Sequence, residues 1–341
     1  MQTILDKINR HFYLFELVLF LLLILVFLIS LSLGKYSASL EKVFSILISP
    51  VFPIDVNWTK LDENIILQVR LPRAVAAVFI GAGLACAGAV FQGIFRNPLA
   101  SPYTLGVSNG AGFGAALAIL LCNSSTAIQF SAMVFALAAV FLALKLGHQA
   151  HSSTVTLILA GVIVGSFFAA LVSLIKFMAD PFDKLPAIVF WLMGSLASIN
   201  LPSLLFSLPL FLGVFLLLIF YSWRINILSM GDAEARSYGV DVKRSRTLVI
   251  ICCSIITAAS VALSGIIGWI GLVIPHLAKI FTGPDFRRLL PVSLMLGGIY
   301  LLIIDDFCRL ISSAEIPLGV VTALLGTPIF AYFMLKEKVK W

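Results

Sequence analysis

The chain has 341 residues, of which 61% are hydrophobic and only 11% carry charge, and its formal net charge is +7. A soluble domain carries charge on about a quarter of its residues, so this composition excludes a soluble globular protein. The positive balance does not indicate nucleic-acid binding, because in a membrane protein the positions of Lys and Arg reflect the side of the membrane.

Apolar runs of roughly 18 residues or more, long enough to cross a bilayer, recur along the whole chain. No polar segment between these runs could form a separate soluble domain. The N-terminal apolar run lacks a clear signal-peptidase cleavage site, so we expect this run to be retained as the first helix. The chain is predicted to be a single all-α, multi-pass transmembrane domain over residues 1–341. Its candidate spans are 12–33, 74–95, 104–122, 127–146, 154–178, 187–222, 247–264, 266–281, 289–304 and 317–335.

Region 187–222 is ambiguous, because Asn200 and Pro202 interrupt it and it could cross once or twice. Basic residues favour the cytoplasmic side. A single crossing places most of the 23 Lys and Arg residues inside, whereas two crossings would move the basic loop 243–246 to the outer face. We therefore predict ten transmembrane helices with both termini cytoplasmic, and a short non-spanning helix over 187–198.

The span interiors hold almost no ionisable side chains, although proton- and ion-coupled carriers usually need them there. Ion coupling is therefore disfavoured. The phosphate-binding pattern GxxxxGK[ST] is also absent, since the Gly34-Lys35 pair is followed by Tyr36. No catalytic residue and no metal site is predicted. If transport is uphill, a partner protein must supply the energy.

Small residues repeat every four positions on three of the spans, which predicts close helix packing in a membrane. These ridges are Gly81, Ala85, Ala89 and Gly93, then Gly106, Gly110, Gly114 and Ala118, and then Gly161, Gly165 and Ala169.

Polar residues and prolines interrupt the apolar sequence after the second span. Irregular backbone at membrane depth is tolerated only against protein or a water-filled cavity. These residues therefore indicate part of a transport path, although a plain cytoplasmic turn is the alternative. The path residues are predicted to be Gln92, Asn97, Pro98, Ser108 and Asn109.

The loop 229–246 is the longest polar segment predicted on the cytoplasmic side. Ser229 and Asp232 have the spacing of a capping box, and Gly239 is a natural helix stop. A short helix is predicted over about 230–238. Such an element could insert into a groove of a partner protein, and the alternative is a solvated basic loop.

Seven motifs, in order along the chain, resemble the FecCD-type family, the permease subunits of ABC importers for iron siderophores, haem and cobalamin. They are RLPR (70–73), AGAVFQGIFRNPLASPYTLGVSNGAG (87–112), FWLMGSLAS (190–198), GDAEARSYGV (231–240), GWIGLVIPHLAKIFTGPDFRRLLP (268–291), DDFCR (305–309) and EIPLGVVTALLGTPIF (315–330).

The resemblance implies a type II ABC importer permease with ten helices in the bacterial inner membrane. It implies a second permease chain, identical or paralogous, two cytoplasmic ATPases that bind ATP and Mg, and a periplasmic or lipoprotein substrate-binding protein. The chain itself would be no enzyme, would hold no cofactor, would contact lipid and would bind no nucleic acid. A ferric siderophore is the favoured cargo, and haem, cobalamin or an oxyanion are the alternatives.

The resemblance also implies roles for individual residues. Arg70, Arg73 and Arg309 match the arginines that dock the binding protein on the outer face. In the loop 229–246, the positions that match the ATPase-coupling motif are Gly231, Asp232, Glu234, Ala235, Arg236 and Gly239.

One departure from the family concerns Phe286, which stands where the family usually has His in GPDHR and leaves no polar group there. Two distant alternatives remain. Asp305 and Asp306 resemble half of the paired aspartate motif of membrane prenyltransferases, but no second aspartate cluster exists. An ion-coupled carrier is the other alternative.

Overall fold

The computed structural model describes residues 12–49, 52, 55–122, 124–149, 154–312 and 314–336. The predicted cytoplasmic ends of the chain lie outside these residues. The long helices are α2 (Phe12–Ser32), α5 (Leu71–Phe95), α7 (Ser125–Gln149), α8 (Thr154–Met178), α10 (Leu201–Phe220), α13 (Val242–Ser264), α15 (Phe286–Ile311) and α16 (Leu318–Lys336). The shorter elements are α3 (Leu40–Ile48), α4 (Lys60–Asn64), η1 (Ile65–Arg70), α6 (Val107–Leu121), α9 (Lys184–Met193), α11 (Ser222–Met230), α12 (Asp232–Ser237) and α14 (Ile270–Thr282).

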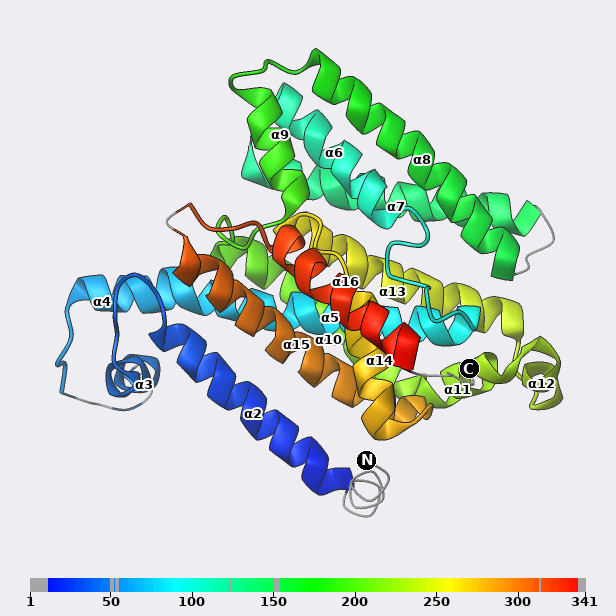
Figure 1. The fold of residues 1–341 in the computed structure, drawn as a ribbon, viewed down its shortest axis with the longest axis horizontal. Helices are drawn as coiled ribbons and strands as arrows, with labels where there is room; N and C mark the ends of the chain where they lie inside the picture. Colours follow the sequence, from blue (N-terminus) through cyan, green and yellow to red (C-terminus); the bar gives the residue numbers. More distant parts are fainter. Residues whose placement is uncertain are drawn as a thin grey trace.

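Seven helical segments of the described chain are long and apolar enough to cross a membrane, and one of them is α4, η1 and α5 in continuous succession. The shorter apolar helices are α6, α9, α14 and α16. If α6, α14 and α16 also cross and the ten-residue α9 does not, the count agrees with the ten membrane helices that the sequence predicts. Figure 1 shows these helices packed in one bundle.

Region 187–222 is divided between a short helix and a long one, and of these only α10 is long and apolar enough to cross a membrane, in agreement with the predicted single crossing. The helix α9 ends at Met193 rather than at 198, since Gly194 adopts a left-handed φ of 76°. The next helix begins after Asn200, whose side-chain oxygen accepts the Ser203 backbone N–H at 3.0 Å and caps the first turn.

Two spans are shorter than the apolar runs suggest. The helix α6 begins at Val107 and not at 104, and α14 begins at Ile270 and not at 266. Before α14, Gly265 and Trp269 both have a φ of 68°. A right-handed α-helix cannot continue through residues with a positive φ. Hydropathy alone does not detect such breaks, because the irregular residues are as apolar as the helices they join.

The centre of the bundle is α5, and Figure 1 shows α2 and α8 on opposite edges of it. The most hydrophobic stretch of the α4–α5 segment is 83% buried, and those of α13 and α15 are 78% and 67% buried. In α2 only 17% of the corresponding stretch is buried. The core therefore consists of α5, α13 and α15, and the peripheral helices present apolar side chains outward.

Two of the three predicted small-residue ridges lie at helix crossings, whereas on the third, on α8, Gly161 packs against the backbone of Thr104 but Ala169 is exposed. A Cβ built on Gly81 would lie 2.2 Å from the Gly297 carbonyl oxygen, and one built on Gly297 would lie 2.3 Å from that of Gly81. The backbones of α5 and α15 are thus in direct contact. Gly110 and Gly114 bring α6 equally close to the carbonyls of α7, so close packing through small residues is confirmed here.

We call the end of the bundle that carries Arg70, Arg73 and Arg309 the outer end, and the end that carries the loop 229–246 the inner end, following the predicted orientation. At the inner end the capping-box prediction is wrong. The Ser229 hydroxyl donates to its own helix, to the Asn226 carbonyl at 2.6 Å. The break between α11 and α12 is made instead by Gly231, whose φ is 135°.

Candidate functional site

A cluster of charged side chains, which we call the outer ion network, joins the outer ends of three helices. Arg73 of α5 donates from Nε to Asp305 Oδ2 of α15 at 2.9 Å and from Nη2 to Oδ1 at 2.9 Å. The same guanidinium donates to both carboxylate oxygens of Glu315, at 3.1 and 3.0 Å. Two bidentate contacts satisfy most of the donors of one arginine, which makes this the strongest class of ion pair.

The second arginine of the outer ion network connects α15 with α2. Arg309 donates to the Asp306 carboxylate and to the Ser30 backbone carbonyl. The Ser30 hydroxyl in turn donates to Asp306 Oδ1 at 2.7 Å. All three residues are buried, so the peripheral helix α2 is held to the core by a satisfied polar contact.

Arg70 lies beside this network and binds only backbone. Its Nη1 donates to the carbonyls of Leu31 and Ser32, at 2.8 and 3.0 Å, and its Nη2 donates to the carbonyl of Tyr36. The last carbonyls of a helix have no partner within the helix, and a guanidinium there also complements the helix dipole. Arg70 therefore caps the C-terminal end of α2.

The three arginines predicted to dock a binding protein thus come together at one end of the bundle, but each is bound inside the permease. Arg70 and Arg309 are 6% and 8% exposed. Docking through them stays a prediction, and a partner would have to compete with these internal contacts. The sequence did not indicate that Ser30, Asp305, Asp306 and Glu315 are their partners.

The aspartate pair considered for a prenyltransferase takes part in the same network. Asp305 is bound by Arg73, and Asp306 by Arg309. Both carboxylates therefore act as counter-ions to arginines within the fold. This pairing gives the two residues a structural role that the DDFCR motif alone did not reveal.

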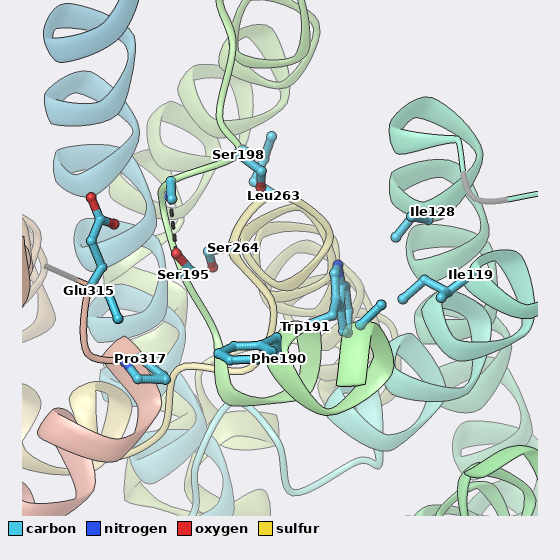
Figure 2. Close-up of a pocket in the computed structure, with 13 residues that line it drawn as sticks. Ile119, Ile128, Phe190, Trp191, Ser195, Ser198, Leu263, Ser264, Glu315 and Pro317 are labelled. Atoms are coloured by element: carbon cyan, nitrogen blue, oxygen red, sulfur yellow. Dashed lines mark hydrogen bonds between the residues drawn. The ribbon is translucent and has the colours of Figure 1, made fainter. Parts of the chain in front are cut away.

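A cavity of about 560 Å³ opens beside the outer ion network, and we call it the outer cavity. Figure 2 shows its wall, with Ile119 and Ile128 on one side, Glu315 and Pro317 on the other, and Ser195 between them. The wall combines apolar, aromatic and hydroxyl side chains with the carboxylate of Glu315. Of the predicted path residues, none lines this cavity.

Backbone hydrogen bonds between distant segments hold the wall of the outer cavity in place. The Ser195 N–H donates to the Ser264 carbonyl at 2.7 Å, and the Leu318 N–H donates to the Gly194 carbonyl at 2.9 Å. Because Glu315 both lines the cavity and binds Arg73, the shape of the cavity depends on the outer ion network.

A second cavity of about 420 Å³ lies at the inner end, and we call it the inner cavity. It shares no lining residue with the outer cavity. Three predicted path residues line it, namely Gln92, Asn97 and Pro98, along with the basic residues Arg96 and Lys279. The irregular segment after α5 therefore borders a cavity, as the broken sequence suggests.

The other two predicted path residues lie elsewhere. Asn109 donates from Nδ2 to the Gly165 carbonyl at 3.0 Å and so connects α6 with α8. Ser108 is buried beside it on α6. Neither residue is among those that line the two cavities, so their place in a path stays a prediction.

Phe286 is the first residue of α15 and lies at the wall of the inner cavity. It is buried, and a Cβ built on Gly93 would lie 2.3 Å from its ring. An apolar ring therefore fills the space beside the glycine ridge of α5, at the position where the family usually has His.

The predicted coupling motif forms α12 and the turns on both sides of it. Ala235 is fully buried, whereas Glu234 and Arg236 are exposed. Gly239 has a φ of 75° and ends the element. Asp232 accepts hydrogen bonds from the guanidinium of Arg246. This ion pair fixes α12 to the first turns of α13.

The Asp232–Arg246 pair predicts a pH dependence. The hydrogen bond from Arg246 lowers the pKa of Asp232 below its usual 3.8. The pair therefore stabilises α12 fully above the ordinary pKa and loses this contribution as the pH falls through the lowered pKa. We expect intrinsic-rate-corrected amide exchange over 232–238 to stay constant down to about pH 4 and to rise below it.

The control for this prediction is Asp232→Asn. The substitution should speed exchange at neutral pH, corresponding to a loss of about 1 kcal/mol for a partly exposed pair, and should remove the acid-dependent step. Equal exchange in both proteins across the pH range would show that the pair does not hold α12.

Comparison with known proteins gives the family. The model of the FecCD transport family matches residues 22–336. The chain is 42% identical to the molybdate import system permease protein MolB of Haemophilus influenzae, over 93% of this chain and 94% of that protein. It is 41% identical to a "probable iron chelatin transport system permease protein" of Helicobacter pylori, over 80% of this chain and 83% of that protein.

A solved structure agrees over almost the full length. An ABC transporter of metal-chelate type, in an inward-facing conformation, superposes with a TM-score of 0.85 at 40% identity, over 95% of this chain and 99% of that one. The family match includes the residues of both cavities and of α12. The chain belongs to the FecCD transport family.

Proposed function

We propose that this chain is the transmembrane permease of a binding-protein-dependent ABC importer in the bacterial inner membrane, and that partner ATPases drive it. The observation that carries the proposal is the family match over residues 22–336, which includes the loop 229–246. The chain supplies the path and the coupling surface, and ATP and Mg belong to the ATPase subunits.

Two cavities without a common lining residue suit alternating access. In this mechanism a transporter opens to one side at a time, through movement of one group of helices against another. The outer cavity would receive cargo from the binding protein, and the inner cavity would release it. Gln92, Asn97 and Pro98 would then line the exit.

The partners follow from the same proposal. A second permease chain, identical or paralogous, would complete the path, because a single chain presents large apolar faces on its peripheral helices. Two ATPases would bind at α12, and a substrate-binding protein would bind at the outer end. Lipid would cover the remaining apolar surface.

The proposed cargo is a metal chelate, with a ferric siderophore as the first candidate. This choice is supported by the metal-chelate type transporter that superposes over 95% of the chain. A molybdate-like oxyanion is the second candidate, because MolB matches over 93% of the chain. Aromatic and hydroxyl groups in the outer cavity could contact either cargo, and the carboxylate of Glu315 in the wall is paired with Arg73.

Reconstitution tests the proposal. The permease, with its ATPases and binding protein in proteoliposomes, is expected to take up labelled ferric siderophore or molybdate only when ATP and the binding protein are both present. The permease alone should take up neither. Uptake by the permease alone, or uptake driven by a proton gradient, would contradict the proposal.

A further inference from the structure

Asn226 joins the helix before the coupling motif to the start of α15. Its Nδ2 donates to Asp285 Oδ1 at 2.6 Å, and its Oδ1 accepts the Phe286 backbone N–H at 2.8 Å. A side-chain amide is a donor and an acceptor at once, so only one orientation of Asn226 satisfies both contacts. The opposite orientation would place its oxygen against a carboxylate.

This contact completes the N-terminal end of α15. Asp285 caps the helix by accepting the Arg287 N–H at 3.0 Å, and the Phe286 N–H is one of the donors that a helix leaves without a partner in its first turn. Asn226 satisfies that donor from a different element. The amide therefore acts as a bridge between two helices and as part of a cap.

The first of these helices, α11, leads directly into the predicted coupling motif. Only Gly231 separates α11 from α12, and α11 packs against α5, α13 and α15. Figure 1 shows α11 and α12 at the same end of the bundle, which also holds the start of α15. A displacement of α12 would therefore be transmitted directly to α11.

The second helix, α15, crosses the whole bundle. Its 26 residues extend over about 39 Å. Its middle is in backbone contact with α5 at Gly297, and its outer end carries Asp305 and Arg309 of the outer ion network. Through Arg73 that network reaches Glu315 in the wall of the outer cavity.

We infer that Asn226 is a positioning residue that transmits movement of the coupling motif to α15, and through α15 to the outer ion network and outer cavity. The inference rests on the proposed function. Coupling between distant sites is carried by rigid elements and hydrogen-bond networks that respond to both sites. α15 is such an element, because hydrogen bonds and ion pairs hold both of its ends.

The test uses Asn226→Ala in the complete transporter, reconstituted with its ATPases and binding protein. We expect ATP-dependent uptake to fall about tenfold, and stimulation of ATP hydrolysis by the binding protein to be lost to a similar extent. Basal hydrolysis and co-purification of the ATPases should stay within about twofold, because the exposed face of α12 is unchanged.

The matched control is Arg224→Ala. This residue lies on the same helix, is exposed, lines neither cavity, and its guanidinium contacts the side chain of Tyr221. The control should retain uptake. If Arg224→Ala and Asn226→Ala lose uptake equally, α11 matters as a whole and the bridge to α15 does not.

A charge exchange provides the rescue. Asn226→Asp alone would place two carboxylates in contact and should reduce uptake at least as much as alanine does. Adding Asp285→Asn moves the amide to the other side of the contact, where it can donate back and still cap α15. We expect the double variant to recover uptake to within about threefold of the unsubstituted complex.

Besides equal losses in the control and in Asn226→Ala, three results would overturn the inference. They are normal uptake in Asn226→Ala, loss of uptake that is accompanied by dissociation of the ATPases, and failure of the charge exchange to restore uptake. If the unsubstituted complex itself shows no uptake dependent on ATP and the binding protein, the proposed function fails instead, before any variant is measured.

Discussion

Replacing Arg73 by alanine is expected to lower the free energy of unfolding of the permease by about 3–5 kcal/mol. The substitution leaves Asp305 buried without its bidentate partner, and Glu315 loses its partner as well. Removing one member of a buried ion pair is costly because the remaining charge is held away from water. The midpoint of thermal unfolding in detergent should fall accordingly.

The double variant Arg73→Ala with Asp305→Ala is the control. The double variant lacks both the Arg73 guanidinium and the Asp305 carboxylate, so neither is left buried without the other. Its loss of stability should therefore be clearly smaller than the sum of the losses in the two single variants. This prediction also separates two roles of Arg73. An unchanged midpoint combined with weaker docking of the binding protein would favour docking over the internal pair.

For Arg70 and Arg309, an effect on docking of the binding protein must likewise be distinguished from an effect on stability. Reversing either residue to Glu would break contacts with the carbonyls of α2, as well as any contact with a binding protein. Docking should therefore be compared only among variants whose thermal midpoints are known. A variant with a normal midpoint and weak docking would support the outer-face role.

Gly297→Leu is expected to prevent correct folding, with a cost above about 3 kcal/mol. The Cβ of any residue at this position would lie 2.3 Å from the Gly81 carbonyl oxygen. The obstacle is backbone rather than a flexible side chain, so α5 and α15 must move apart. Because lipid provides no hydrophobic drive for helices to associate, the lost contact is not replaced.

The yield of monodisperse protein in size-exclusion chromatography and its resistance to trypsin would measure this effect. Gly213→Leu is the matched control, because Gly213 also lies inside a membrane helix but has no atom within 4 Å of a built Cβ. The control should fold normally. Equal losses in both variants would mean that bulk, and not the α5–α15 crossing, causes the defect.

Several features could be predicted from local sequence. The number of membrane helices, the single crossing of 187–222 and the irregular segment after α5 follow from hydropathy, from the distribution of Lys and Arg, and from proline. The exposed face of α12 follows from its composition. Each of these properties depends on residues that are close together in the chain, so it can be predicted without knowing which helices are neighbours.

Other features depend on which helices are neighbours. Arg73 is 242 residues from Glu315, and Asn226 is 59 residues from Asp285. The sequence near Arg73 or Asn226 does not indicate which residue is its partner. The RLPR motif alone suggested arginines that face outward.

The sequence by itself thus determined a multi-pass helical membrane protein and the approximate bounds of its helices, because burial in a bilayer requires apolar helices of a certain length. Only the tertiary structure decided how its charges are used. A charge inside a low-dielectric bundle needs a partner, and the crossing of α5 and α15 at Gly81 and Gly297 brings that partner within reach.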